Sequence, residues 1–119
     1  MEISLLENLE EIVFQKGSMQ ESIPSQIFRM PSLEHIDLDR NELSGTIEVN
    51  GESSVQKLDI NFNNFTGSID FLTSFPNITV AFLDNNNFDG TIPSSLGNLT
   101  NLCKFNIKMF IIFVGTWCV

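Results

Sequence analysis

The chain has 119 residues, 42% of them hydrophobic, and a formal net charge of −9 with only six Lys and Arg. This length gives room for one domain. Because nucleic acids and anionic membrane surfaces attract basic proteins, the acidic balance argues against both as partners.

The N-terminal segment, MEISLLENLEEIVFQ, holds four Glu residues and no Lys or Arg. A signal peptide has a basic stretch followed by an apolar one, so this segment is not expected to be one. Leu5, Leu9 and Ile12 have the spacing of an acidic amphipathic helix, but Leu9, Ile12 and Phe14 agree better with a repeat that recurs downstream. We therefore predict a first coil that the chain enters midway, as in a fragment or a truncated gene model.

Three stretches in the middle of the chain share one pattern: LDRNELSGTI at 38–47, INFNNFTGSI at 60–69 and LDNNNFDGTI at 83–92. An Asn, an apolar residue, a Gly and an Ile keep their spacing in each, and the copies lie 22 and then 23 residues apart. Recurrence over roughly 20–50 residues is typical of a solenoid. With the degraded copies at both ends, about five coils are predicted, near residues 9–32, 33–54, 55–77, 78–101 and, degraded, 102–119.

Each copy contains a strand-spaced apolar pair such as Ile36 and Leu38, which predicts one short parallel strand per coil. At the following turn an Asn amide can both donate and accept, so it can satisfy backbone groups that have no ladder partner. The predicted structural Asn ladder consists of Asn41, Asn63 and Asn86. The glycines expected to adopt positive φ or to allow close backbone approach are Gly45, Gly67 and Gly90.

The segment LEHIDLDRNELSGTI at 33–47 resembles the plant-type leucine-rich repeat, and GTIPSSLGNLTNL at 90–102 resembles it most closely. The resemblance covers about residues 3–107 and implies an α/β-type leucine-rich-repeat solenoid with a parallel sheet on the concave face. Short 3-10 or extended segments are implied on the convex face. It also implies recognition of a protein, peptide or glycan ligand, usually in the ectodomain of a receptor-like protein or receptor kinase.

Three departures from the family pattern stand out. The paired Cys caps of secreted members are missing, residues 48–54 lack the Pro and the middle Leu of the repeat, and no kinase sequence follows. The solenoid is expected to span residues 1–107, with 108–119 as a hydrophobic tail or cap.

The C-terminal segment from 109 onward is an apolar run of about 11 residues, whereas a membrane-spanning helix needs about 20. A complete membrane span is therefore not expected, although a longer parent protein could be membrane-anchored. The segment can be a hydrophobic last coil, the start of a truncated anchor, or sequence not selected to fold here. We prefer the first of these interpretations.

Cys103 and Cys118 are the two cysteines of the chain, and both lie close to its end. A disulfide between them would close a small loop. Because free Cys is so often buried among apolar residues, the preferred interpretation is two unpaired thiols.

Three sequons for N-glycosylation occur, and their acceptors are Asn64, Asn77 and Asn98. All three acceptors fall at variable positions of the repeat, where a glycan has room. The alternative is chance, because the repeat is rich in Asn. Used sequons would favour an extracellular or cell-surface location for the parent protein, and unused ones a cytoplasmic location.

Residues that flank the buried positions of each strand should face outward and form columns along the stack. The centre of that face is acidic, and two Phe side chains lie beside it. The candidate ligand-binding residues are His35, Asp37, Asp39, Lys57, Asp59, Phe62, Phe82 and Asp84. Such a surface could accept a basic or aromatic peptide, with Phe as anchor and Asp for steering. The alternative is an ordinary solvated sheet face.

Enzyme chemistry finds little support in the residues. His35 is the sole histidine, and no Gly-rich phosphate loop is present. A carboxylate pair of Asp37 and Asp59, or a Ca²⁺ site that adds Asp39, is conceivable from strand spacing but lacks a nucleophile or a loop motif. We expect no catalytic residues, no metal and no cofactor.

Three functional hypotheses remain. The first is a recognition module that binds a protein or peptide on the concave face, as a fragment of a receptor-like ectodomain. The second is an intracellular scaffold built from the same repeats. The third is a truncated remnant of a receptor-like kinase without independent function.

Overall fold

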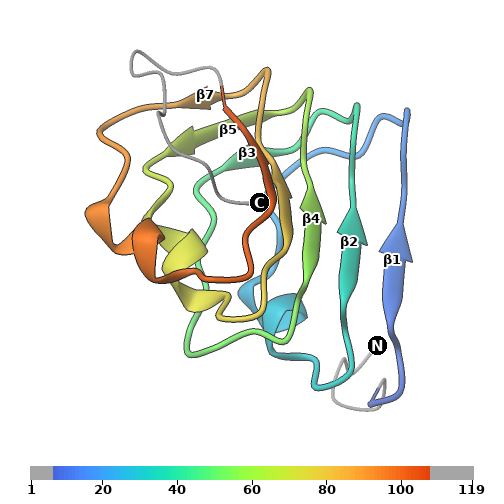
Figure 1. The fold of residues 1–119 in the computed structure, drawn as a ribbon. Helices are drawn as coiled ribbons and strands as arrows, with labels where there is room; N and C mark the ends of the chain where they lie inside the picture. Colours follow the sequence, from blue (N-terminus) through green and yellow to red (C-terminus); the bar gives the residue numbers. More distant parts are fainter. Residues whose placement is uncertain (1–6, 108–119) are drawn as a thin grey trace.

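The computed structural model describes residues 7–107, and in it the chain winds into a curved stack of coils (Figure 1). One short strand per coil joins a parallel sheet in the order β1-β2-β4-β6-β8. These strands are β1 (Glu11–Val13), β2 (His35–Asp37), β4 (Lys57–Asp59), β6 (Val80–Phe82) and β8 (Lys104–Asn106). The predicted fold class, a leucine-rich-repeat solenoid with a parallel sheet, is confirmed.

A second parallel sheet lies on another side of the three central coils, in the order β3-β5-β7. Its strands are β3 (Ser44–Gly45), β5 (Asn64–Gly67) and β7 (Asn87–Phe88). The sequence analysis did not predict this sheet, because Asn and Gly are poor strand residues. Stacking of equivalent backbone at one repeat per layer brings these segments into hydrogen-bonding distance despite their composition.

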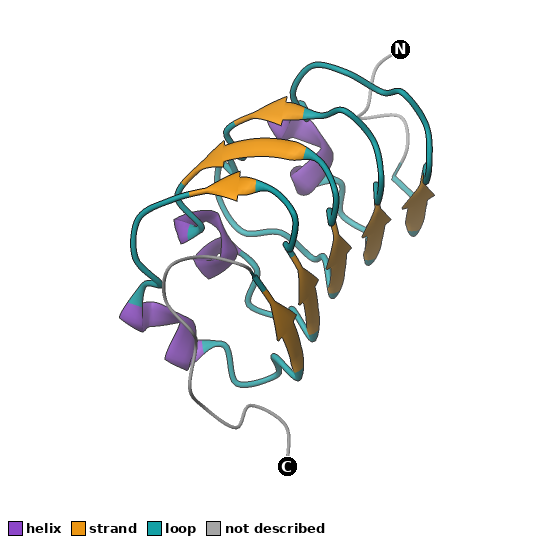
Figure 2. Cartoon of the chain, turned by 90° about the horizontal axis from the view of Figure 1, so that it is seen from above, coloured by secondary structure: helices purple, strands orange, loops and turns teal. Residues whose placement is uncertain are grey.

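Short 3-10 helices close the coils on the convex side, as predicted (Figure 2). They are η2 (Ser25–Arg29), η3 (Asp70–Ser74) and η4 (Ser94–Asn98). The coil between β3 and β4 has no such helix in the structure, which agrees with its shorter sequence. There the Ser53 amide donates to the Ser74 carbonyl at 2.8 Å, and the Ser54 hydroxyl donates to the Leu33 carbonyl at 2.7 Å. These bonds satisfy backbone groups that a helical turn would otherwise cover.

The interior holds a connected chain of phenylalanine rings. Phe28 lies 5.5 Å from Phe75 between ring centroids, and Phe71 lies 6.2 Å from Phe75 and 5.9 Å from Phe88. Phe88 in turn stacks on Phe65 at 6.3 Å. Phe28 precedes β2 and Phe75 follows β4, so their contact passes over the short coil that lacks a helix. The rings therefore connect coils that are not neighbours in the stack.

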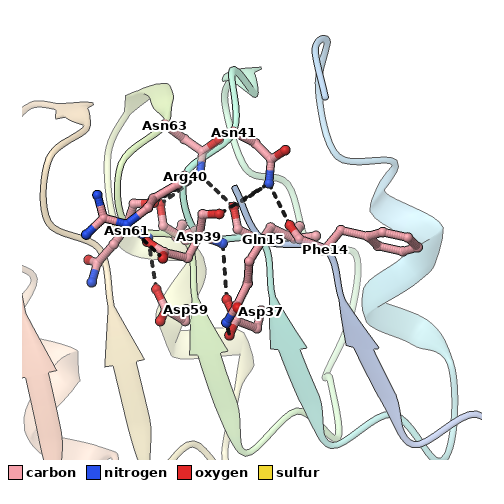
Figure 3. A network of polar contacts seen from close by, with 11 residues as sticks. Phe14, Gln15, Asp37, Asp39, Arg40, Asn41, Asp59, Asn61 and Asn63 are labelled. Carbon is pink, nitrogen blue, oxygen red and sulfur yellow. Dashed lines mark hydrogen bonds and ion pairs between the residues drawn. The ribbon is translucent and has the colours of Figure 1, made fainter. Parts of the chain in front are cut away.

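The Asn side chains of the predicted ladder bond to backbone groups of their own coil and of the preceding one. The Asn63 amide donates to the Leu38 carbonyl at 2.9 Å and to the Ile60 carbonyl at 3.2 Å, and its Oδ1 accepts from the Leu43 amide at 3.1 Å. Asn41 repeats this arrangement one coil earlier, where it bonds to the Phe14 carbonyl (Figure 3). Each amide thus supplies donors and an acceptor to the turn of the coil before it.

Left-handed backbone recurs after the ladder in each described coil. Gly67 has φ +86°, and a Cβ added there would lie 2.8 Å from the Thr46 Cγ2 atom, so both conformation and space require glycine. The degraded first coil has Glu21 at the corresponding place, with φ +73°. The first coil therefore adopts the backbone of the others with a side chain that is strained there.

Cys103 is disulfide-bonded in the structure, which corrects the preferred interpretation of an unpaired thiol at this position. The burial frequency of free cysteine was a poor guide, because Cys103 is only half-buried and directly precedes β8 at the end of the described stack. Cys118 and the predicted tail at 108–119 lie outside the described residues.

Candidate functional site

The strands of the five-stranded sheet are in register, so equivalent side chains line up along the stack. One column contains Glu11, His35, Lys57, Val80 and Lys104. The next contains Val13, Asp37, Asp59, Phe82 and Asn106. All eight predicted ligand-binding residues lie in these columns or in the turns that directly follow the strands, and they therefore occupy one face.

Asp37 differs from the others because its side chain is buried, with 8% of its surface exposed. Its Oδ1 atom accepts from the Asp39 amide at 3.1 Å, and its Oδ2 atom accepts from the Gln15 side chain (Figure 3). Asp59 repeats the first of these bonds by accepting from the Asn61 amide at 3.1 Å. Asp37 was expected to be a solvated carboxylate. In the structure it is mainly a hydrogen-bond acceptor that shapes the turn after β2.

Asp59 sits in an electrostatically unfavourable place. Burial raises the pKa of its carboxyl, and the charges of Asp37 and Asp39 raise it further, against the lowering effect of the Asn61 amide and of His35. Since the folded-state pKa lies above the unfolded one, stability falls as pH rises through the folded value. The ionised Asp59 therefore disfavours the fold at neutral pH, and a nearby cation from a ligand would relieve that cost.

Arg40 and Phe62 form a contact at the rim of the face. The Arg40 Cζ atom lies 4.1 Å from the centroid of the Phe62 ring, and its Nε atom lies 3.4 Å from Oδ2 of Asp39. Phe62 is 40% exposed and has φ +57°, an uncommon conformation for a bulky residue. The same positive φ recurs at Lys16, Arg40 and Asn85, so this conformation belongs to the turn of the repeat, and the exposed ring is what distinguishes this coil.

Asp84 completes the acidic side of the face. Its Oδ1 atom is buried and has no hydrogen-bond partner among the described residues. Its backbone amide donates to the Asn61 side-chain oxygen at 2.6 Å and thereby fixes the turn. A buried carboxylate oxygen without a donor costs folding free energy. Because this oxygen is covered, a partner on the surface can pair only with the exposed part of the half-buried Asp84 side chain.

The start of the strands carries charge of the other sign. His35 Nδ1 lies 3.6 Å from the Glu11 carboxylate, and Lys57 and Lys104 are exposed in the same column. Lys104, Arg40 and Asn61 were missed as candidates because the sequence analysis concentrated on the acidic centre. Their positions in the columns were the signal that could have identified them.

The three sequon acceptors lie away from the five-stranded sheet. Asn64 is on β5, Asn77 follows η3, and Asn98 is the last residue of η4. All three are exposed. Glycans at these positions would leave the concave face uncovered.

Residues 7–107 contain neither a metal-binding cluster nor a membrane-spanning helix. No group of three or more His, Cys, Asp or Glu there is placed to hold a metal ion. No helix in that range is long and apolar enough to cross a membrane.

Comparisons with known proteins agree with this geometry. The family profile for Leucine Rich Repeat matches residues 32–51 and 77–99. The calmodulin-binding receptor kinase CaMRLK of Arabidopsis thaliana is 34% identical over 108 residues, which cover 87% of this chain and 16% of that protein. Receptor-like protein 7 of the same plant is 35% identical over 98 residues, covering 80% and 10%.

The solved leucine-rich-repeat ectodomain of the Arabidopsis receptor kinase HAESA, in complex with an IDA peptide hormone ligand, matches with a TM-score of 0.72 at 25% identity. That match covers 90% of this chain and 19% of the ectodomain chain. This chain thus spans less than a fifth of each of these proteins. It is a leucine-rich-repeat protein of the plant type, and it resembles a piece of the ectodomain of a receptor-like protein or receptor kinase.

Proposed function

We propose that this chain is a non-enzymatic recognition module that binds a protein or peptide through its concave five-stranded sheet. The observation that carries the proposal is the register of the sheet, which lines up outward-facing charged and aromatic side chains over adjacent strands. The HAESA ectodomain, which resembles this chain, was solved with a peptide hormone. We infer the same general role here, as part of an extracellular receptor-like protein.

The chemistry of the face indicates a ligand with basic and aromatic or aliphatic groups. Asp39, Asp59 and Asp84 supply negative charge, and Phe62 and Phe82 supply apolar contact area next to it. Charge of this kind mainly steers and selects the partner, while a partly desolvated ring gives most of the anchoring energy. Asp84 is half-buried at the edge of this face, where part of its side chain is open to a basic group of the ligand.

Peptide selection tests the proposal. Random peptides displayed on phage would be selected against the full chain, and the enriched sequences remade as synthetic peptides. We expect Asp84→Asn to raise the dissociation constant of these peptides about fivefold. A loss of this size corresponds to removing one partly exposed ion pair. Asp70→Asn makes the same change on the exposed convex helix η3 and should leave the dissociation constant unchanged. Equal effects of the two variants, or no enrichment at all, would contradict binding on the concave face.

Glycan attachment tests the proposed extracellular setting. The full chain, which keeps both cysteines, should gain mass at Asn64, Asn77 or Asn98 when it is secreted from a eukaryotic host, because all three acceptors are exposed and lie off the concave sheet. The intact mass of the protein before and after glycosidase treatment gives the number of attached glycans. Asn→Gln at each acceptor in turn serves as the control. A secreted product with no added mass would favour the intracellular scaffold instead.

A further inference from the structure

A hollow of about 220 Å³ lies on the concave face over β4, β6 and β8. Leu58, Val80 and Phe82 supply its apolar lining. The polar groups around it are those of His35, Lys57, Asp59 and Lys104. The hollow therefore combines an apolar floor with two ammonium groups. This is unexpected on the face of a chain whose net charge is −9.

The two lysines are placed to act together. Lys57 and Lys104 flank Val80 in one column, on the strands either side of β6, so their Cα atoms are roughly 10 Å apart. Both side chains are exposed, and long lysine stems can bring their ammonium groups toward one point above Val80. Within the described residues neither forms an ion pair, whereas His35 and Arg40 do. The hollow thus presents two lysines outside any ion pair of the described residues, against the single carboxylate of Asp59.

Opposite charge lies further along the same strand. Val80, Phe82 and Asp84 follow one another at every second position, so they share one face and are spaced roughly 7 Å apart. The face accordingly changes along β6 from basic, beside Val80, to apolar at Phe82 and to acidic at Asp84. An extended peptide has the same two-residue spacing on each of its faces.

We propose that the hollow binds a carboxylate side chain of an extended peptide, and that the same peptide places an apolar side chain over Phe82 and a basic one over Asp84. The ligand is then of the class acidic-x-apolar-x-basic and lies along β6. Lys57 and Lys104 receive its carboxylate, and the half-buried Asp84 side chain attracts its basic end. This inference rests on the concave face being the binding surface proposed above. It adds an acidic residue to the expected peptide, which an entirely acidic face would repel.

The test compares pools of random nine-residue phage-displayed peptides selected on three forms of the full chain. These are the wild type, the double variant Lys57→Glu/Lys104→Glu, and the control Lys16→Glu/Arg29→Glu, which makes the same change in net charge at exposed positions outside the hollow. We expect the wild-type pool to be enriched in an acidic residue four positions from a basic one. A synthetic peptide from that pool should bind about tenfold more weakly to the double variant and unchanged to the control.

Folding of each variant is checked by circular dichroism, and Lys57→Gln/Lys104→Gln replaces the double reversal if the latter unfolds. A pool enriched only in basic and apolar residues, bound equally by all three forms, would overturn this inference and leave the proposed function standing. The absence of enrichment on any form would overturn both. A peptide in which the acidic residue is replaced by a basic one should bind Lys57→Glu/Lys104→Glu more tightly than it binds the wild type. This result would further support the role of the two lysines.

Discussion

Replacing Phe75 by Ala is expected to destabilise the fold by about 3–5 kcal/mol, because the ring is fully buried and its removal leaves a large cavity. The ring touches both Phe28 and Phe71, so its loss disconnects the aromatic chain in the middle. A solenoid normally couples neighbouring coils only. Here the Phe28 contact also couples coils on either side of the short one, so the loss should spread over three coils.

Urea unfolding followed by circular dichroism measures this effect. Phe14→Ala removes the same ring from a 58% exposed position and should change the midpoint little. The free energy lost in Phe75→Ala can be close to the entire free energy of unfolding of a small domain, so this variant can fail to fold. Phe75→Leu is a milder variant, with an expected loss of about 1–2 kcal/mol. Midpoints for Phe75→Leu and Phe14→Ala that do not differ would show that the aromatic chain has no special part in stability.

Asn63→Ala is expected to cost about 2–3 kcal/mol, because it leaves the Leu43 amide without its partner and takes one of two Asn donors from the Leu38 and Ile60 carbonyls. The Leu43 amide and the Leu38 and Ile60 carbonyls all bond to this side chain. Asn63→Asp keeps the acceptor for Leu43 but loses the donors, so it should also destabilise. Asn77→Ala, at an exposed position, is the matched control.

Hydrogen exchange gives a local measurement of the same variant. Protection of the Leu43 amide should fall sharply in Asn63→Ala, whereas amides of the more distant β8 should exchange as before. A Leu43 amide that remains protected, together with an unchanged urea midpoint, would mean that water replaces the side chain at little cost.

The solenoid could be predicted from the sequence because its causes are local and repeated. Asn41, Asn63 and Asn86 recur with the apolar frame, and only a stack of equivalent turns gives so many amides backbone partners. The parallel sheet follows from one strand-spaced pair in each repeat. The 3-10 helices follow from the repeat pattern, and their absence after β3 agrees with the shorter second copy.

Other features depend on contacts between coils, which no single repeat encodes. The sheet of β3, β5 and β7 forms from two- to four-residue segments in which Asn and Gly weaken the strand propensity of Phe and Thr. The Phe28–Phe75 contact exists because an intervening coil is short. The burial of Asp37 could not be predicted from its outward-facing register, since it depends on the Gln15 side chain from the coil before it.

The sequence could predict that the candidate ligand-binding residues share one face. It could not predict which of their charges are paired within the protein. Columns follow directly from the repeat spacing, and the register of β2, β4 and β6 places His35, Lys57 and Asp59 in them. Whether a given charge is free or engaged depends on side-chain contacts. Asp39 is paired with Arg40, whereas Lys57 has no ion pair in the described part of the chain.

The Asn ladder has a direction, and this direction bears on how the chain folds during synthesis. Asn41, Asn63 and Asn86 each reach back to the coil made before them, at the Phe14, Leu38 and Ile60 carbonyls. A coil that has just left the ribosome therefore has an incompletely bonded turn until the next Asn emerges about 22 residues later. Folding of the nascent chain should lag synthesis by one repeat, and the newest coil is the one that a chaperone would find open.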